Sequence, residues 1–481
     1  MNIAKSLILG SAATLVALGG AQAADLPLKA KAVEYVKVCS LYGAGFYYIP
    51  GTDTCIKLGG YLRADTSFNA SGAYDLPRQG NTTRANQTYI ARARQDINID
   101  TRTATEYGVV RTYFDVTFNW TTGSAVRAGV DDASGPLGGN NTGVGVYYAF
   151  IQFAGFTIGK AISQFSTPWT GYPGNNTSYL IGGPDDVTGI NQLAYTAQFG
   201  NGVSAAVSLE DSSGIYFNSA GMYTYNSYNR APLYALDANG GIINNGWAGS
   251  NIPDIVGQIR VDQAWGLFQV SAVAHNLHPS YYGGIPANGA PSDAWGFAVT
   301  AGLSLKNLPT GAGDSINFDV TYADGASRYV VGGVSPDTWT FAGNKGTTQA
   351  FLYSSDGVFG LNGGIEKTQA WGLRGAFNHN WDPYWSSSLF GSYTQVRYNN
   401  NARALAAVST LCPVTITTCN PGGNLWQIGT VLRWTPVKNL TFSGEVLYSY
   451  IETLMVGRQS NGTIAKDNGT WTFGVRAQRV F

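Results

Sequence analysis

Along most of this chain, apolar and polar residues alternate with a period of two. In segment 88–103, the odd positions from Tyr89 to Ile99 are mainly apolar, whereas the even positions from Arg92 to Arg102 are charged or carry an amide. The next segment repeats this pattern, with Phe114, Phe118 and other apolar residues on one face. Because successive side chains of a strand point to opposite faces, this period predicts β-strands with one apolar and one polar face.

About sixteen segments follow this pattern, including a weakly alternating one from Trp385 to Val396. They begin near residues 57, 88, 107, 144, 156, 189, 203, 254, 267, 294, 315, 368, 385, 424, 440 and 470. The connections alternate in length, with short ones near 103–106, 155, 200–202, 264–266, 307–314, 382–384 and 436–439. The long ones are rich in Gly and Asn and lie near 69–87, 121–143, 163–188, 212–253, 277–293, 324–367, 398–423 and 453–469.

Alternation alone does not distinguish a soluble β-protein from a membrane barrel, but three features favour the barrel. Short turns alternate with long loops, many strands are ten or more residues long, and aromatic residues stand at strand ends, among them Trp120, Trp295, Trp381 and Trp434. We therefore predict a sixteen-stranded antiparallel transmembrane β-barrel over 57–481, with short periplasmic turns and long external loops. A barrel of this size leaves an aqueous channel, and segment 24–56 is too short for a plug domain.

The N-terminus has the features of a secretory signal peptide. Lys5 is followed by the apolar stretch Ser6–Gly20 and by Ala21-Gln22-Ala23, which predicts cleavage after residue 23. No later apolar run approaches the ~18 residues of a membrane helix. We therefore expect the mature protein in the bacterial outer membrane, with membrane lipid as a partner; a soluble periplasmic protein is a distant alternative.

Composition supports this class. Charged residues make up 12% of the 481 residues, against about 25% in a typical soluble domain. Lys plus Arg and Asp plus Glu both number 29, so nothing indicates the basic face of a nucleic-acid-binding protein.

Four cysteines, Cys39, Cys55, Cys412 and Cys419, enter an oxidising compartment if the chain is exported. Four cysteines allow three connectivities. The simplest pairs the sequence neighbours, Cys39 with Cys55 in the predicted periplasmic segment 24–56 and Cys412 with Cys419.

Charges concentrate on the predicted inner face of the first three strands. This charged wall comprises Lys57, Arg63, Asp65, Arg92, Arg94, Asp96, Asp100, Arg102, Arg111 and Asp115. One interpretation is that it sets the potential felt by permeating ions; the alternative is ion pairing that merely satisfies the strand faces. Loop 163–188 contains Asp185 and Asp186 but no base. If it folds inward as a constriction, its two acids could face the arginines; the alternative is an ordinary external loop.

Catalytic and metal-binding motifs are not recognisable. The three histidines, His275, His278 and His379, have no accompanying cluster of metal ligands, and no nucleophile or phosphate-binding motif follows a suitable strand. We therefore expect neither a metal nor a cofactor, and no enzymatic activity.

Two segments and the last residue carry a family resemblance. Segment Val33–Arg63 closely resembles the start of the alphaproteobacterial general porins, and Ile151–Lys160 resembles the strand before the loop that folds into their pore. The chain also ends in Phe481, as bacterial outer-membrane proteins do. The resemblance implies a homotrimeric sixteen-stranded barrel that passes small hydrophilic solutes and ions by diffusion, with loop 163–188 as the constriction.

Two other functions stay open on the sequence. One is a substrate-specific channel, which saturable block by a single solute would reveal. The other is a non-conducting adhesive or structural barrel, for which loops 212–253 and 324–367, rich in Tyr, Asn and Gly, could serve.

Overall fold

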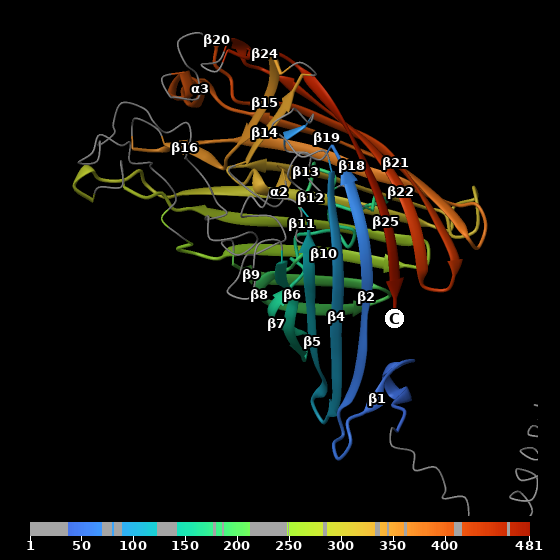
Figure 1. Cartoon of the computed structure of the whole chain (residues 1–481). Coiled ribbons are helices and arrows are strands. Elements are labelled where there is room, and N and C mark those ends of the chain that lie inside the picture. The colour runs from blue at the N-terminus through green and yellow to red at the C-terminus, as the bar shows by residue number, and fades with distance from the viewer. Residues whose placement is uncertain are drawn as a thin grey trace, which may run out of the picture.

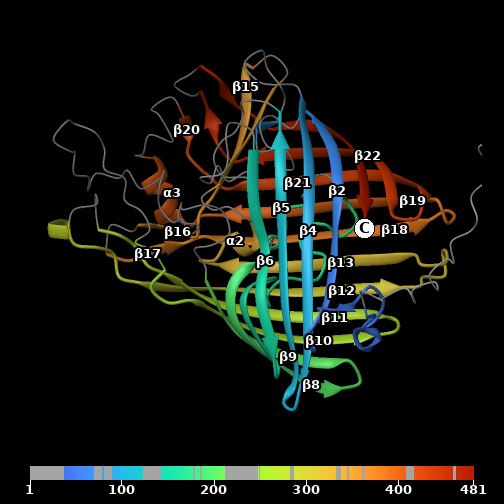
Figure 2. The same ribbon diagram turned by 60° about the horizontal axis from the view of Figure 1, so that its bottom comes forward.

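Sixteen strands of one antiparallel sheet close on themselves as a barrel, and a two-residue strand at Tyr47–Tyr48 adds a seventeenth strand to the sheet (Figures 1 and 2). The last strand pairs with the first over the register from Tyr61↔Val480 to Phe68↔Phe473, which completes the barrel. The computed structural model describes residues 37–69, 79–80, 89–122, 142–176, 179–184, 187–211, 248, 250–281, 286–331, 337–343, 346–359, 363–407, 416–458 and 462–481.

The barrel strands follow one another around the sheet in chain order. They are β2 (Cys55–Phe68), β4 (Tyr89–Thr105), β5 (Gly108–Thr121), β6 (Thr142–Phe153), β7 (Phe156–Ala161), β8 (Ile190–Gly200), β9 (Val203–Glu210), β10 (Asp254–Gln263), β11 (Gly266–Leu277), β12 (Ala294–Lys306), β13 (Ser315–Asp324), β18 (Gln369–Asn380), β19 (Trp385–Arg397), β21 (Gly423–Val437), β22 (Leu440–Thr453) and β25 (Asn468–Val480).

The predicted architecture is confirmed. Each of the sixteen strands begins within two residues of its predicted start, including the weakly alternating β19. The connections alternate as predicted: from these bounds, the short ones have two to eight residues and the long ones fourteen to 44. The barrel therefore has a short-turn end and a long-loop end.

Tight two-residue turns explain why the short connections can stay so short. Asn201 and Gly202 join β8 to β9 with positive φ angles of 49° and 72°. Hairpin turns of this kind match the twist of the flanking strands, and Asn and Gly adopt the required left-handed conformation at low cost.

The two faces of the sheet differ sharply in chemistry. On β13, Phe318 and Val320 are each 39% exposed, whereas Asp319 and Thr321 between them are buried. The aromatic residues predicted at strand ends also lie outward and exposed: Trp120, Trp295, Trp381 and Trp434. An apolar outer face around a polar interior is the arrangement of a membrane barrel.

Parts of the long loops form a second layer of structure at the long-loop end, where α3, β15 and β20 gather in both views (Figures 1 and 2). Three loops contribute to a four-stranded sheet in the order β24-β15-β14-β3. The described elements of the long loops, inside and outside this sheet, are β3 (Gln79–Gly80), η3 (Pro286–Asn288), α2 (Arg328–Val331), β14 (Asp337–Ala342), β15 (Thr348–Ser354), β16 (Gly357–Phe359), β17 (Ile365–Lys367), α3 (Asn400–Ala407), β20 (Ile416–Thr418), β23 (Val456–Gly457) and β24 (Ile464–Ala465).

A hydrophobic core lies inside the barrel, between these loops and one part of the wall. Trp339 and Phe341 of β14 and Leu352 of β15 are buried against inward residues such as Leu425 and Ile451. This part of the interior is packed with side chains rather than open. No helix of the described ranges is long and apolar enough to cross a membrane.

The segment before the barrel is attached to the first strand. Residues 37–54 contain η1 (Ser40–Tyr42) and β1 (Tyr47–Tyr48), which pairs with β2. The disulfide joins Cys39 to Cys55. Cys419 is also disulfide-bonded, and its expected partner Cys412 lies outside the described residues, as does the predicted signal peptide. The pairing of Cys412 with Cys419 and the cleaved signal peptide therefore stay predictions.

The outward face of β13 allows a test of the membrane orientation. Replacing Val320 by Arg puts a charge at the middle of the span, which should lower the free energy of unfolding by about 2–4 kcal/mol. The matched control is Val437→Arg, at the short-turn end of β21, where the cost falls to about 0–1 kcal/mol. Denaturant unfolding in lipid vesicles measures both values. Equal costs at the two positions would contradict the orientation.

Candidate functional site

The described residues of segment 163–188, which we call the inner loop, lie inside the barrel in the connection between β7 and β8. Glu210 at the end of β9 accepts hydrogen bonds from the Ser163 hydroxyl (2.5 Å) and from the Gln164 backbone N–H (2.9 Å). On β11, the amide of Gln269 donates to the carbonyl of Ser166 (2.9 Å). These contacts begin a series that continues across the inward faces of β13, β18, β21 and β22.

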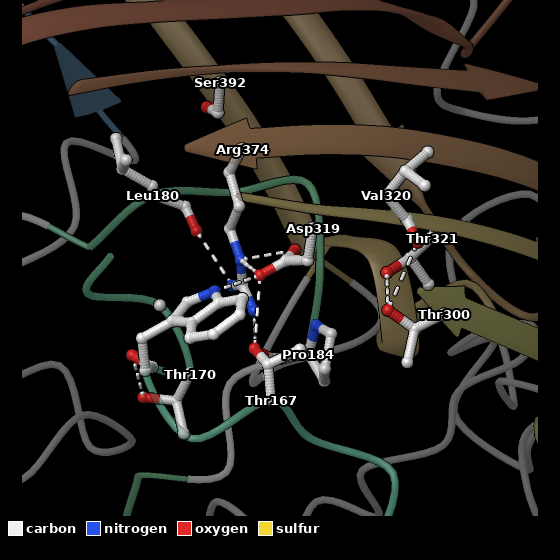
Figure 3. Close-up of polar contacts among 12 residues, drawn as sticks. Thr167, Thr170, Leu180, Pro184, Thr300, Asp319, Val320, Thr321, Arg374 and Ser392 are labelled. Carbon is white, nitrogen blue, oxygen red and sulfur yellow. Dashed lines mark hydrogen bonds and ion pairs between the residues drawn. The ribbon is translucent and has the colours of Figure 1, made fainter. Parts of the chain in front are cut away.

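A buried ion pair holds the middle of the inner loop (Figure 3). Nε of Arg374 on β18 lies 2.9 Å from Oδ1 of Asp319 on β13, and both side chains are fully buried. The two residues are direct cross-strand neighbours. Such a pair is tolerated in a low-dielectric interior only when further hydrogen bonds satisfy its remaining polar atoms.

The inner loop supplies those hydrogen bonds from two limbs. In the first limb, residues 163–170, the Thr167 hydroxyl (3.2 Å) and the Trp169 indole N–H donate to Asp319. In the second limb, residues 179–184, the carbonyls of Leu180 (3.3 Å) and Pro184 (2.9 Å) accept from Arg374. The ion pair therefore fixes both limbs to the same point of the wall.

Glycines allow the inner loop to approach the wall this closely. Gly182 has a φ of 117°, and a Cβ at the inward position Gly372 of β18 would lie 2.4 Å from the Cα of Gly182. Any side chain at position 372 would push the second limb away from the wall. The inward glycine thus makes room for the loop backbone.

The tip of the inner loop is fixed on β21 and β22. Arg433 donates to the side-chain oxygen of Asn176 (3.1 Å) and to the carbonyl of Gly174. Glu445 accepts from the backbone N–H of Asn176. The inner loop thus runs along the inner surface from β9 to β22.

A cavity of about 250 Å³ separates the inner loop from the opposite wall. On the wall side, four arginines line it, which we call the arginine face: Arg63, Arg92, Arg94 and Arg476. Two tyrosines of the wall, Tyr61 and Tyr147, complete this side. The inner loop contributes Tyr172, Asn175, Asn176 and Val187. The described lining thus carries four positive charges and no carboxylate.

Neighbouring groups hold the arginine face in place. The buried Asp65 lies between Arg92 (3.3 Å) and Arg476 (3.5 Å). Arg94 donates to the Tyr147 hydroxyl (2.7 Å), and Arg63 donates through Nε to Gln478 (2.8 Å). The guanidinium of Arg63 also stacks 4.3 Å from the centroid of the Tyr61 ring.

Other residues of the predicted charged wall lie away from this cavity. Towards the short-turn end, Asp100 is paired with both Arg102 (2.9 Å) and Arg111 (3.0 Å). Beside them, Lys57 and Arg102 lie over the ring of Phe46, 5.9 and 4.9 Å from its centroid. Of the ten residues of the charged wall, the structure therefore places only Arg63, Arg92 and Arg94 on the cavity itself.

The remaining two acids of the charged wall, Asp96 and Asp115, are buried. Asp96 and Asp115 are 3% and 7% exposed, and each has a neutral neighbour as hydrogen-bond donor, Asn98 for Asp96 and Tyr113 for Asp115, both at 3.4 Å. Asp185 and Asp186 lie outside the described residues, so their predicted position opposite the arginines stays a prediction.

Three important residues are absent from the prediction: Arg476, Asp319 and Arg374. Arg476 follows the same period of two on the last strand, between the outward Val475 and Ala477, and lies directly opposite Asp65 once the barrel closes. The alternation of the last strand is therefore enough to place Arg476 on the inner face from the sequence. Within the described ranges, no group of three or more His, Cys, Asp or Glu side chains is placed to hold a metal ion.

Comparison with known proteins identifies relatives for most of the chain. The model of the porin subfamily matches residues 25–473. Porin Omp2a of Brucella canis is 39% identical over 222 residues, which cover 44% of this chain and 56% of that porin. Porin Omp2b of Brucella suis is 36% identical over 272 residues, which cover 55% of this chain and 68% of that porin. The match to Omp2a thus spans little more than half of that relative's length.

A solved structure shares the fold at lower sequence similarity. The outer membrane channel DcaP of Acinetobacter baumannii superposes with a TM-score of 0.60, covering 90% of this chain and 99% of that one, at 15% identity. This likeness concerns the fold alone. Together, the family match along the chain and the closed sixteen-stranded barrel show that the chain belongs to the porin subfamily and is an outer-membrane β-barrel protein.

Proposed function

We propose that this protein is a passive channel through which small hydrophilic solutes and ions diffuse down their own gradients. The observation that carries the proposal is the polar cavity between the arginine face and the inner loop, inside a closed barrel with an apolar outer surface. Sixteen strands enclose more space than their own side chains fill. Diffusion through such a space needs no covalent step and no cofactor.

The narrowest part of the path, in this proposal, lies between the arginine face and the inner loop, and it favours anions. Four guanidinium groups line the cavity, and the buried Asp65 neutralises part of their charge. A low-dielectric wall focuses the resulting field on a passing ion.

A substrate-specific channel is the second candidate, and the aromatic lining favours it. Tyr61, Tyr147 and Tyr172 border the same small cavity as the arginines. Aromatic faces and guanidinium donors together could retain a solute that bears an anionic group beside a flat or apolar part. Conductance that saturates with one such solute would favour this candidate over free diffusion.

We also propose that the protein assembles as a homotrimer, as its resemblance to the alphaproteobacterial porins implies. Chemical cross-linking of the protein extracted in mild detergent should then give a band at three times the chain mass. Planar-bilayer recordings should show conductance steps in groups of three. A cross-linked species that stops at two chains, with single steps, would contradict the trimer.

Charge removal at the arginine face tests the location of the selectivity filter. Arg63→Gln should shift the reversal potential under a salt gradient towards cation preference, with the anion-to-cation permeability ratio falling about twofold or more, because a unit charge at ~5 Å contributes ~0.8 kcal/mol even in water. The matched control is Lys306→Gln, which removes one positive charge at the exposed end of β12. An equal shift in both variants would place the filter elsewhere.

The anchoring role of the buried ion pair allows a separate test. Asp319→Asn leaves the Arg374 guanidinium buried without its carboxylate, a change that costs about 3–5 kcal/mol. We expect the inner loop to loosen, which should appear as noisier open channels and closure at lower voltage. Asp262→Asn, which breaks the more exposed pair with Arg260, is the control and should cost about 0–1 kcal/mol. Recordings of Asp319→Asn that match the control would show that the ion pair does not position the loop.

A further inference from the structure

The short helix α2 belongs to loop 324–367, yet it lies against the inner loop. All four of its residues are buried, with Tyr329, Val330 and Val331 at 0–1% exposed. They share one hydrophobic cluster with Phe165, Tyr179 and Ile181 of the inner loop. A second long loop therefore reaches into the barrel and contacts the first.

Helix α2 contacts both limbs of the inner loop. The ring of Tyr329 packs edge-on against Phe165 of the first limb, with centroids 4.6 Å apart. The carbonyl of Val330 accepts from the backbone N–H of Gly182 (2.9 Å), and the carbonyl of Val331 accepts from the Tyr179 hydroxyl (2.9 Å). Gly182 and Tyr179 both belong to the second limb.

In both hydrogen bonds the acceptor is a carbonyl at the C-terminal end of α2, where the helix itself offers no donor. The last carbonyls of any helix lack an intrahelical partner, and a buried carbonyl without a partner is costly. In α2 those carbonyls face the inner loop, so the end of the helix and the second limb satisfy each other. Apolar packing alone would not specify this alignment of the two segments.

The barrel wall holds α2 in turn. The Tyr329 hydroxyl donates to Asp254 on β10 (2.5 Å), which also contacts Nδ1 of His275 on β11 (2.7 Å). At the start of the helix, the Ser327 hydroxyl (2.9 Å) and the Arg328 backbone N–H (3.3 Å) both donate to Oδ1 of Asp356. The helix is thus connected to two barrel strands and to its own loop.

We propose that residues 325–331 are a positioning element that clamps the inner loop from the side of the long-loop end. In this assignment two sets of contacts set the geometry of the narrow passage: the ion pair of β13 and β18 holds the inner loop on the wall, and α2 of loop 324–367 holds both of its limbs. The inference rests on the proposed function in so far as the clamped loop borders the conducting path. It adds that loop 324–367, distant in sequence, keeps the channel open.

Tyr179→Phe is the sharpest test, because it removes the hydroxyl that donates to Val331 and keeps the ring. The matched control is Tyr398→Phe, which also removes a buried hydroxyl in the same cluster; that hydroxyl donates to the carbonyl of Tyr353, outside the inner loop. Both full-length variants are refolded, and heat-modifiable gel migration confirms a closed barrel. Hydrogen exchange of the peptides that cover 179–184 and 325–331 is then compared with the unmodified protein.

We expect Tyr179→Phe to speed exchange in both segments, since each loses a partner, whereas Tyr398→Phe leaves them unchanged. In planar bilayers, the closed-to-open ratio should rise about five- to tenfold, the change that one buried hydrogen bond is worth. Ion selectivity should not change, because the arginine face is untouched. Exchange in Tyr179→Phe that equals the unmodified protein, or the control, would overturn the clamp.

Two further outcomes distinguish a failure of the clamp from a failure of the proposed channel function. If Tyr179→Phe does not refold, Tyr329→Phe is judged by the same exchange criterion, since it removes the bond to Asp254 and keeps the contact with Phe165. If the unmodified protein conducts nothing, the proposed function fails, and the exchange of 179–184 and 325–331 still decides whether α2 clamps the inner loop.

Discussion

The ion pair between Asp319 and Arg374 joins two neighbouring barrel strands to both limbs of the inner loop. A loop normally runs over a protein surface because water can satisfy its backbone groups. Inside a barrel, the wall has to supply partners for these backbone groups instead, and here inward side chains such as Arg374, Gln269 and Arg433 donate to loop carbonyls. Since removing two charges from water is costly, the value of the pair lies less in net stability than in fixing where the loop must be.

The position of the loop divides the barrel interior into two unlike parts. Against β10 to β22, the inner loop and loop 324–367 complete a hydrophobic core with residues such as Trp339, Leu352 and Leu425. Against β2, β4 and β25, the inner loop leaves a polar cavity bordered by arginines. The number of strands sets the circumference of the barrel, but these packed loops set how much of its cross-section stays polar.

The positions of the barrel strands could be predicted from the sequence, because the period of two that marks a barrel strand lies within the strand's own residues. Even β19, whose alternation is weak, began where the sequence predicted. The same period placed Arg63, Arg92 and Arg94 on the inner face. The site was harder to predict because its contacts join distant segments. Asp319 and Arg374 become neighbours only when β13 pairs with β18 across 44 intervening residues, and that register has no local signal.

The loop elements were not predicted at all, for a related reason. Helix α2 has four residues, too few for a helical period to appear, and the strands β3 and β24 have two residues each. Such short segments are stabilised by the partners they meet rather than by their own sequences.

The four-stranded sheet of β3, β14, β15 and β24 has a consequence for how this protein can evolve. Surface loops tolerate insertions and sequence changes better than the elements they connect, and independent loops can change one at a time. Here three loops share main-chain hydrogen bonds in one sheet. An insertion within one of these strands would disturb its register with strands of the other loops, so changes in length should be tolerated at loop positions outside the sheet, or as coordinated changes in several loops.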